Sequence, residues 1–278
     1  MIIDSHQHFW DLARGDYGWL TPETNVLYRN YLPEDLVGIL EQSGIRATVL
    51  VQAAPTEAET AYLLELSDAH PFIAGVVGWA NFESNEAPEQ IAALTDRGQG
   101  KLKGLRPMIQ DIPDSAWVAR AELDAAFEAM VSNDLIFDAL VKPMHLNALL
   151  DRLLRHPNLE SVLDHCGKPD IEHGGFDTWA TSVERLARET NIHCKLSGLL
   201  TVAGSQGPEA VAPYVAHIFS CFGPGRIVWG SDWPVLNSVS DYARWLSLSN
   251  ALVKRWAPTQ TDDVMAKNAR RLYRLRLA

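Results

Sequence analysis

Short apolar runs alternate with longer amphipathic stretches from one end of this chain to the other. Several of the runs, such as residues 47–51, are almost continuously apolar, which is typical of parallel strands covered on both faces. Eight runs, each followed by a helix-like stretch, predict an α/β fold whose strands close into a (β/α)8 TIM barrel. The predicted strands are Ile2–His8, Thr48–Ala53, Ile73–Asn81, Leu102–Arg106, Leu135–Val141, Ser161–His165, Ile192–Ser197 and Arg226–Ser231.

The stretches between these strands have the apolar spacing of amphipathic helices. Pro33 suits the first position of a helix, and Gly44 suits the cap that ends it. The tail Asp262–Leu277 contains four arginines and is expected to form a last helix that packs outside the barrel. The other predicted helices are Pro33–Ser43, Glu57–His70, Glu86–Arg97, Ala121–Ser132, His145–His156, Thr178–Thr190, Pro208–Phe222 and Tyr242–Trp256.

An open, doubly wound sheet is the main alternative to the barrel. A nucleotide-binding version of that fold has a G-x-G-x-x-G turn after its first strand or a Walker G-x-x-x-x-G-K loop, and this chain has neither. The chain also lacks a linker rich in Ser, Gly and Pro and shows no shift in composition along its length. We therefore expect a single domain over residues 1–278.

Composition excludes several classes of protein. Apolar residues make up 47% and charged residues 21%, which excludes a disordered or collagen-like chain. The net charge of −11 disfavours nucleic acid or an anionic membrane as a partner, since both attract basic surfaces. Three separated cysteines (Cys166, Cys194 and Cys221), no signal-peptide-like start and no apolar run of roughly 20 residues predict a cytoplasmic protein.

The first predicted strand carries two histidines, His6 and His8. Residues two apart in a strand face the same side, so Asp4, His6 and His8 are expected to point together. His8 is nearest to the C-terminal end of the strand, where the active sites of barrels form. The competing interpretation is a pair of structural histidines that bind backbone carbonyls.

An aspartate, Asp232, follows the eighth predicted strand in the sequence GSDWP. The eighth strand of a closed barrel lies beside the first, so this carboxylate is expected near His8. A carboxylate at the mouth of a strand, close to two imidazoles, suits either acid–base chemistry or metal binding. The competing interpretation is an aspartate that caps the following helix.

Further imidazole and cationic side chains fall at the ends of other predicted strands. His165 and Lys168 follow the sixth strand, while Lys195 lies in the seventh. Lys103 and Arg106 belong to the fourth strand. Because an isolated buried ammonium is costly, each lysine needs a counter-charge or a ligand. Salt bridges explain any one of these cations, whereas several at one end of the barrel favour an oxygen-rich substrate.

The motifs IDSHQHFW (3–10), GLR (104–106), DHCGKP (164–169) and GSDWP (230–234) together resemble the amidohydrolase superfamily over nearly the whole chain. They are similar to its amidohydrolase-2 branch of sugar-lactone hydrolases, which includes L-fuconolactonases and L-galactono- and L-rhamnonolactonases. The resemblance implies that His6, His8, His165 and Asp232 form the catalytic centre.

The resemblance also bears on metals. Binuclear members of the superfamily carry a bridging carboxylated Lys or a Glu at the fourth or fifth strand and histidines at the fifth and sixth. Here the fifth strand reads FDALV (137–141), without His or Lys, so a two-metal centre is not expected. One divalent ion, zinc by ligand preference, is expected on His6, His8 and Asp232, and metal-independent catalysis stays open as the alternative.

For a lactonase of this kind, the expected substrate is a small sugar (aldono) lactone, opened to the aldonic acid by water. Asp232 would be the general base, and His6, His8 and His165, or a metal they hold, would stabilise the oxyanion. We expect a monomer or homodimer with no nucleic-acid or membrane partner. The expected substrate contacts are Lys103, Arg106, Lys168 and Lys195, with the indoles of Trp19, Trp79 and Trp233 against the sugar ring.

Two other functions stay open from sequence alone. The first is metal-dependent decarboxylation of an aromatic or muconate-type acid on the same barrel. The second is a non-catalytic barrel that binds sugar acids. Release of carbon dioxide would identify the first, and lactone binding without turnover would identify the second.

Overall fold

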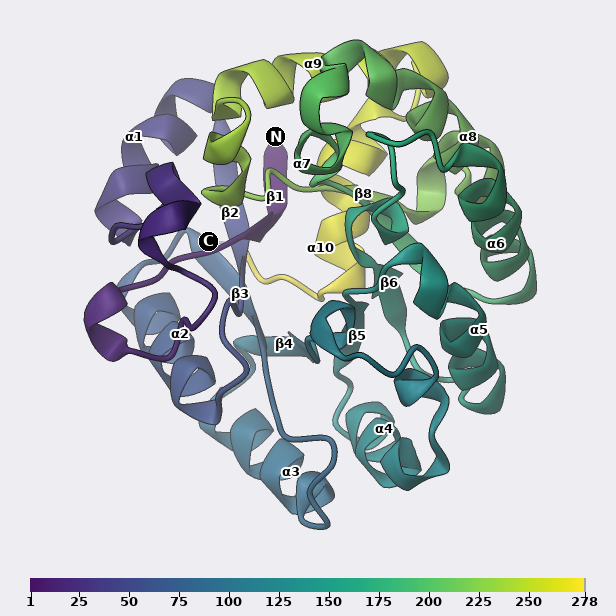
Figure 1. Cartoon of the computed structure of the whole chain (residues 1–278). Coiled ribbons are helices and arrows are strands. Elements are labelled where there is room, and N and C mark those ends of the chain that lie inside the picture. Colours follow the sequence, from purple (N-terminus) through teal and green to yellow (C-terminus); the bar gives the residue numbers. More distant parts are fainter. Residues whose placement is uncertain (278) are drawn as a thin grey trace.

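The computed structural model describes residues 1–277, in which eight strands form one sheet in the order β1 to β8 (Figure 1). Every neighbouring pair along this order is parallel. The loop after β8 returns to β1, where the His8 N–H donates to the Trp233 carbonyl at 2.8 Å. The predicted (β/α)8 TIM barrel is thus confirmed. The strands are β1 (Ile2–Gln7), β2 (Ile45–Val51), β3 (Ile73–Gly78), β4 (Leu102–Leu105), β5 (Ile136–Ala139), β6 (Ser161–Leu163), β7 (His193–Leu196) and β8 (Ile227–Trp229).

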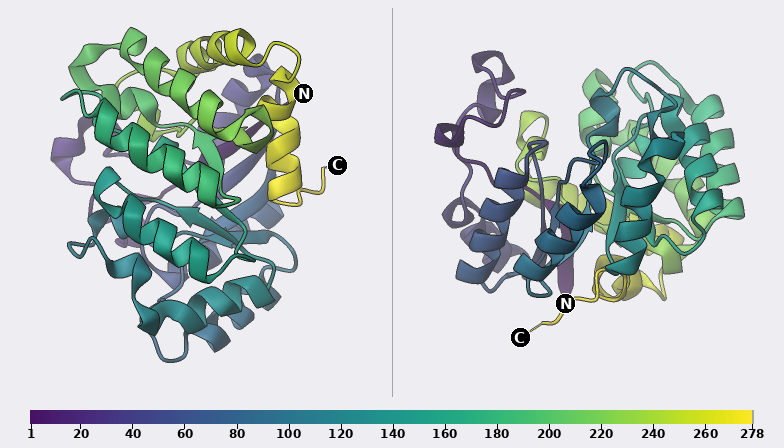
Figure 2. Two further views of the ribbon diagram at one scale, coloured as in Figure 1. Left: turned by 90° about the vertical axis from the view of Figure 1, so that its right-hand side faces the viewer. Right: turned by 90° about the horizontal axis from the view of Figure 1, so that it is seen from below.

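Helices surround the strands (Figures 1 and 2). The predicted helix over 208–222 is divided in the structure, because a 3-10 segment covers Pro208–Val211 before α8 begins. The short helix α7 was not predicted. The helices are α1 (Pro33–Ser43), α2 (Glu57–Ala69), α3 (Ala87–Arg97), α4 (Asp124–Ser132), α5 (Leu146–Arg155), α6 (Phe176–Glu189), α7 (Leu199–Ala203), α8 (Ala212–Phe222), α9 (Tyr242–Trp256) and α10 (Asn268–Leu272).

The C-terminal segment closes the barrel from below instead of packing outside it, so that expectation was wrong. In Figure 1, α10 is seen through the ring of strands, and Figure 2 shows it at the end of the molecule where both termini lie. The tail packs against inward-facing strand residues such as Ile3 and Val49. The apolar residues of the tail are suited to packing on the outside of the barrel or against its interior. Only the closed ring of strands creates the interior space that they fill. The buried tail residues are Ala266, Ala269, Leu272, Tyr273 and Leu275.

Strand β1 departs from simple alternation, which corrects a second expectation. Its pairing with β2 shifts register between Asp4 and Gln7. The Asp4 carboxylate therefore does not face the same way as His6 and His8. It accepts the Ser231 N–H at 2.8 Å and the hydroxyl of Tyr242, on α9, at 2.9 Å. Asp4 thus joins β1 to the loop after β8 and to an outer helix, outside the barrel interior.

Within residues 1–277, no helix combines the length and the apolar character needed to cross a membrane. The cytoplasmic location and the monomeric or homodimeric state stay predictions.

Candidate active site

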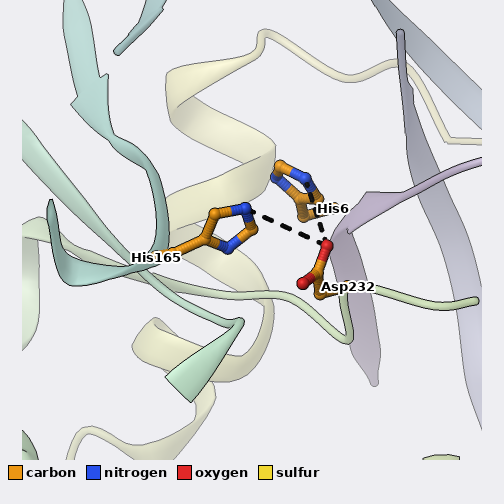
Figure 3. Close-up of side chains that lie close together, drawn as sticks. All are labelled: His6, His165 and Asp232. Carbon is orange, nitrogen blue, oxygen red and sulfur yellow. Dashed lines mark ion pairs between the residues drawn. The ribbon is translucent and has the colours of Figure 1, made fainter. Parts of the chain in front are cut away.

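Four polar side chains meet where β1, β6 and β8 end. The nitrogen Nε2 of His8 lies 3.4 Å from Asp232 Oδ1, and that of His6 lies 3.7 Å from it. His165 Nε2 approaches the same oxygen to 3.9 Å, from the opposite side of the barrel mouth (Figure 3). The structure thus brings together the predicted group, although Asp232 follows His8 by more than two hundred residues.

The turn after β8 aims Asp232 at the histidines. Its φ of 61° lies in the left-handed region, and its N–H donates to the His6 carbonyl at 2.8 Å. A Cβ at Gly230 would lie 2.7 Å from the His6 Cβ, so a glycine lets the turn approach β1 this closely. The competing role of helix cap belongs to Asp241, which accepts the Arg244 N–H at the start of α9.

His165 is held by a tight turn directly after β6. Its φ of 51° is again left-handed, and its Nδ1 lies 2.9 Å from the Ser197 hydroxyl. Gly198 has a φ of +63°, and a Cβ there would lie 2.5 Å from His165 Nδ1. A side chain at position 198 would therefore displace the imidazole. The loop after β7 orients the ring so that Nε2 faces Asp232.

The site combines an ionised carboxylate with neutral imidazoles. Burial lowers the pKa of His165 to about 4, lowers the pKa of His8, and, with the Lys195 ammonium, holds the pKa of His6 far below its ordinary value. Burial raises the pKa of Asp232, but the neighbouring imidazoles of His165, His8 and His6 outweigh it and the net direction is downward. At neutral pH the arrangement therefore offers one carboxylate beside three uncharged rings.

His8, His165 and Asp232 line a cavity of about 300 Å³ at the barrel mouth, whereas His6 is fully buried behind them. A cavity of about 430 Å³ lies elsewhere, between α7 and α9, but its lining contains no histidine. Chemistry, rather than size, identifies the mouth cavity as the candidate site. Its lining includes the predicted His8, Trp19, Arg106, His165, Lys168 and Asp232, together with Ala53, Met108, Gln110, Asp111, Leu140 and Val235.

The two predicted cations of the cavity are fixed by different partners. Arg106 is buried, with NH1 at 3.5 Å from Asp164 Oδ2, while its carbonyl accepts the Gln52 amide at 2.6 Å. Lys168 is half-buried, and its Nζ donates to Gln110 Oε1 at 2.5 Å. Both positive charges therefore face the same space as the Asp232 carboxylate.

Sequence reasoning missed lining residues that come from the turn after β4. Gln110 belongs to a 3-10 turn, Ile109–Asp111, and its N–H donates to the Leu140 carbonyl beyond β5. The sequence feature that could have identified Gln110 is its position, a few residues beyond the C-terminal end of a predicted strand. Trp19, which was predicted, stands at the rim with its indole N–H donating to the Ala53 carbonyl at 2.8 Å.

Four of the predicted substrate contacts, Lys195 among them, do not line the cavity. Lys103 lies near the start of β4, and its Nζ donates to the Arg274 carbonyl at the closed end of the barrel. The backbone N–H of Trp79 donates to the Thr60 hydroxyl on α2, and that hydroxyl donates to the Trp79 carbonyl. The third, Trp233, is a buried core residue whose ring packs edge-on against the rings of two neighbours, Phe9 and Tyr31.

Lys195 also lies outside the cavity, buried beneath it. Its Nζ is 2.5 Å from Asp138 Oδ2 and 2.9 Å from Asp164 Oδ1, and it is 3.1 Å from His6 Nδ1. The counter-charge that a buried lysine requires is thus supplied twice. Tyr273, from the C-terminal segment, donates its hydroxyl to Asp138 at 2.9 Å.

The donor spacing at the mouth fits one zinc ion. Tetrahedral zinc with bonds of roughly 2.0–2.2 Å separates its ligand atoms by about 3.3–3.6 Å. The Nε2 atoms of His6 and His8 are 3.2 Å apart, and they lie 3.7 and 3.4 Å from Asp232 Oδ1. His165 is grouped with His6 and Asp232 at slightly longer range. A set of two imidazoles and a carboxylate is also chemically suitable for zinc.

Comparison with known proteins gives the family. The amidohydrolase family model matches residues 3–275. An L-fucono-1,5-lactonase from Burkholderia ambifaria is 42% identical over 98% of this chain and 95% of its own length. A second L-fucono-1,5-lactonase, from Burkholderia multivorans, is 35% identical over 93% of this chain and 89% of its own.

A solved structure is similar over the same span. The crystal structure of an amidohydrolase from Burkholderia multivorans with bound zinc superposes with a TM-score of 0.92. It is 31% identical and covers 99% of this chain and all of that one. The chain therefore belongs to the amidohydrolase family, which confirms the resemblance inferred from its motifs.

Proposed function

We propose that this protein is a hydrolase of lactone ester bonds that opens an aldono-1,5-lactone to the aldonic acid. The observation that carries the proposal is the Asp232 carboxylate, which faces a cavity of about 300 Å³ that is also lined by His8, His165, Arg106 and Lys168. The 42% identity to an L-fucono-1,5-lactonase supports a six-membered sugar lactone as the substrate. Support from sequence covers nearly the whole chain, so the proposal does not depend on a single motif.

Asp232 would activate the attacking water. The imidazole nitrogens of His6, His8 and His165 stand 3.4–3.9 Å from Oδ1, beyond the usual 2.7–3.2 Å of a hydrogen bond, which leaves this oxygen able to accept a water proton. The water oxygen adds to the lactone carbonyl while Asp232 takes its proton. As the bond from the carbonyl carbon to the ring oxygen breaks, the same proton passes from Asp232 to the departing alkoxide. The product is the open hydroxy acid.

The negative charge that develops on the carbonyl oxygen needs donors fixed in advance. Arg106 and Lys168 bring basic side chains to the cavity, and His165 is oriented into it by Ser197. We assign these three side chains to the oxyanion and the emerging carboxylate. Because they are held by surrounding partners, little reorganisation is needed when the charge appears.

A divalent ion, with zinc as first candidate, would be held by His6, His8 and Asp232. When bound, such an ion would polarise the water and lower its pKa. The roles of Arg106 and Lys168 do not depend on it. The indole of Trp19 at the rim offers an apolar face to the sugar ring.

A panel of 1,4- and 1,5-aldonolactones, followed by acid release in a pH-stat, tests the proposal. We expect L-fucono-1,5-lactone and related six-membered lactones to open fastest after subtraction of spontaneous hydrolysis. Carbon dioxide release from aromatic or muconate-type acids, with no lactone turnover, would favour the decarboxylase. Binding of lactones without acid release would instead indicate a non-catalytic sugar-acid barrel.

A further inference from the structure

A buried glutamate, Glu59, lies behind the wall of the mouth cavity and has no part in the proposed mechanism. It occupies the third position of α2, and its side chain is fully buried. The N-cap of this helix is Thr56, and a glutamate three positions later usually reaches back to the N–H of the N-cap residue. Here the Thr56 N–H donates to the Ala54 carbonyl at 2.9 Å instead. Capping of the helix therefore does not account for the Glu59 carboxyl group.

The Glu59 carboxyl group binds the turn that follows β2. Its Oε1 accepts the Ala53 N–H at 3.0 Å, and its Oε2 accepts the Ala54 N–H at 2.8 Å. Burying a carboxyl group is costly unless its oxygens find donors, and these two N–H groups supply them. Ala53 lines the mouth cavity, so the turn that Glu59 holds is part of the cavity wall.

The same turn holds Trp19 from the other side. The indole N–H of Trp19 donates to the Ala53 carbonyl at 2.8 Å. This carbonyl and the Ala54 N–H belong to one planar trans peptide unit, in which they point in opposite directions. The peptide therefore links the Glu59 carboxyl group to the Trp19 indole, and it cannot rotate without weakening both hydrogen bonds.

A second set of contacts holds the segment that carries the indole. The Thr56 hydroxyl donates to Asp16 Oδ2 at 3.2 Å, and Arg14 NH2 lies 2.7 Å from the same oxygen. The Arg14 guanidinium also lies over the ring of Tyr62, on α2, at 4.4 Å from the ring centroid. This segment is thus docked on α2 beside Glu59.

The Trp19 ring is held at one edge and keeps a free surface at the cavity. It packs edge-on against Trp10 with 5.3 Å between the ring centroids, and 38% of Trp19 is exposed. Trp19 also lines the mouth cavity. An aromatic face that is fixed in advance can pack on a sugar ring without the cost of ordering the side chain on binding.

We propose that Glu59 is a positioning residue: through the Ala53–Ala54 peptide it fixes the Trp19 indole at the rim of the mouth cavity, where the indole packs on the sugar ring of the substrate. Glu59 itself does not line the cavity. A contact made equally in the ground state and in the transition state lowers KM and leaves kcat unchanged. The inference rests on the proposed function for the sugar ring, whereas the placement of Trp19 is tested without substrate.

Fluorine NMR of the whole protein, labelled with fluorotryptophan, tests the placement of Trp19 directly. The Trp19 signal is identified by its loss in Trp19→Phe. In Glu59→Gln an amide NH2 replaces one acceptor oxygen and faces a backbone N–H, so we expect the Trp19 signal to shift and its line to broaden. Glu57→Gln is the matched control, since it makes the same change at a partly exposed side chain of the same helical turn and should leave the signal unchanged. An unchanged Trp19 signal in folded Glu59→Gln would overturn the proposal, whatever the lactone panel gives.

Steady-state kinetics on the lactone that opens fastest test the effect on binding. We expect Glu59→Gln and Trp19→Phe each to raise KM about 3–10-fold and to change kcat less than about 2-fold. In the Trp19→Phe background Glu59→Gln should raise KM no further, because the indole N–H that the peptide holds is already absent. Equal effects of Glu59→Gln in the two backgrounds, or a fall in kcat without a rise in KM, would contradict the proposal.

A second variant applies if Glu59→Gln does not fold. Glu59→Asp keeps the carboxyl group but withdraws it by one methylene group, and we expect the same displacement of the Trp19 signal. An undisturbed signal in folded Glu59→Asp would likewise overturn the proposal. A displaced Trp19 signal in a protein that opens no lactone would support the placement of Trp19 by Glu59 and would count against the proposed function alone.

Discussion

The two ends of the barrel interior are built in opposite ways. At the mouth, the Asp232 carboxylate lies 3.4 Å or more from the imidazole nitrogens around it and faces a cavity. At the floor, Lys195 has two carboxylates and an imidazole within 3.1 Å, and the C-terminal segment fills the space below with Leu272 and Tyr273. The mouth leaves polar groups free for a substrate, whereas the floor satisfies them within the chain.

The difference separates stability from chemistry. Burying a charge without partners is costly, so the floor groups are paired and held by packing. The mouth keeps an accessible carboxylate whose contacts are left to water and substrate. Changes at the mouth should therefore reduce turnover with little loss of stability, and changes at the floor should do the reverse.

Asp232→Asn gives the largest expected effect at the mouth. Loss of the general base should lower kcat about 10²–10⁴-fold, while the melting temperature stays close to that of the wild type. The rate is measured in a pH-stat and the stability by thermal unfolding. Asp111→Asn, which removes another carboxylate of the same cavity, is the control and should change kcat only slightly. A near wild-type rate in Asp232→Asn would mean that another group activates the water.

Leu272→Ala tests the floor. This side chain is buried among the inward-facing strand residues, and its truncation should lower the free energy of unfolding by about 2–5 kcal/mol. The kcat of the folded fraction should change little. Leu154→Ala, at a leucine that is 49% exposed on α5, is the control for denaturant unfolding. Equal destabilisation of both variants would show that the tail does not support the barrel.

Lys168→Met at the mouth and Lys103→Met at the closed end are a matched pair of variants that compare the two ends of the barrel. Loss of a charged hydrogen bond to substrate costs about 1.5–3 kcal/mol, so kcat/KM should fall about 10- to 150-fold at position 168. Lys103 contacts the Arg274 carbonyl at the closed end, and its replacement should leave kcat/KM unchanged. Steady-state kinetics on the same lactone measure both. A loss of similar size at position 103 would be inconsistent with the separation of mouth and floor.

Local pattern was sufficient for most of the architecture. Apolar runs and helical spacing depend on neighbours close in sequence, and the eight predicted strands all appear in the barrel. Neighbours close in sequence could not predict the division of the 208–222 helix or the register shift in β1. Both depend on how a segment meets a neighbouring strand or loop, which alternation alone cannot reveal.

The convergence of the candidate site residues could be predicted where motif and topology agreed. A closed barrel places the ends of β1, β6 and β8 around one mouth, so His6, His165 and Asp232 converge whatever their distance along the chain. Which of the individual cations line the cavity could not be predicted in this way. Lys103 lies near the start of β4 at the closed end, and Lys168 lies beyond the end of β6 at the mouth, and only the closed barrel separates these two environments.

Sequence alone was sufficient to infer the repeating strand–helix order, the family and the candidate group of His6, His8, His165 and Asp232. Each of these inferences depends only on residue type and on spacing along the chain. Tertiary structure decided which charges neutralise each other and which stay free. Ring closure created the interior that the tail fills, and it set Lys195 between Asp138 and Asp164. Electrostatic pairing depends on distances through space, and those distances exist only once the chain has closed on itself.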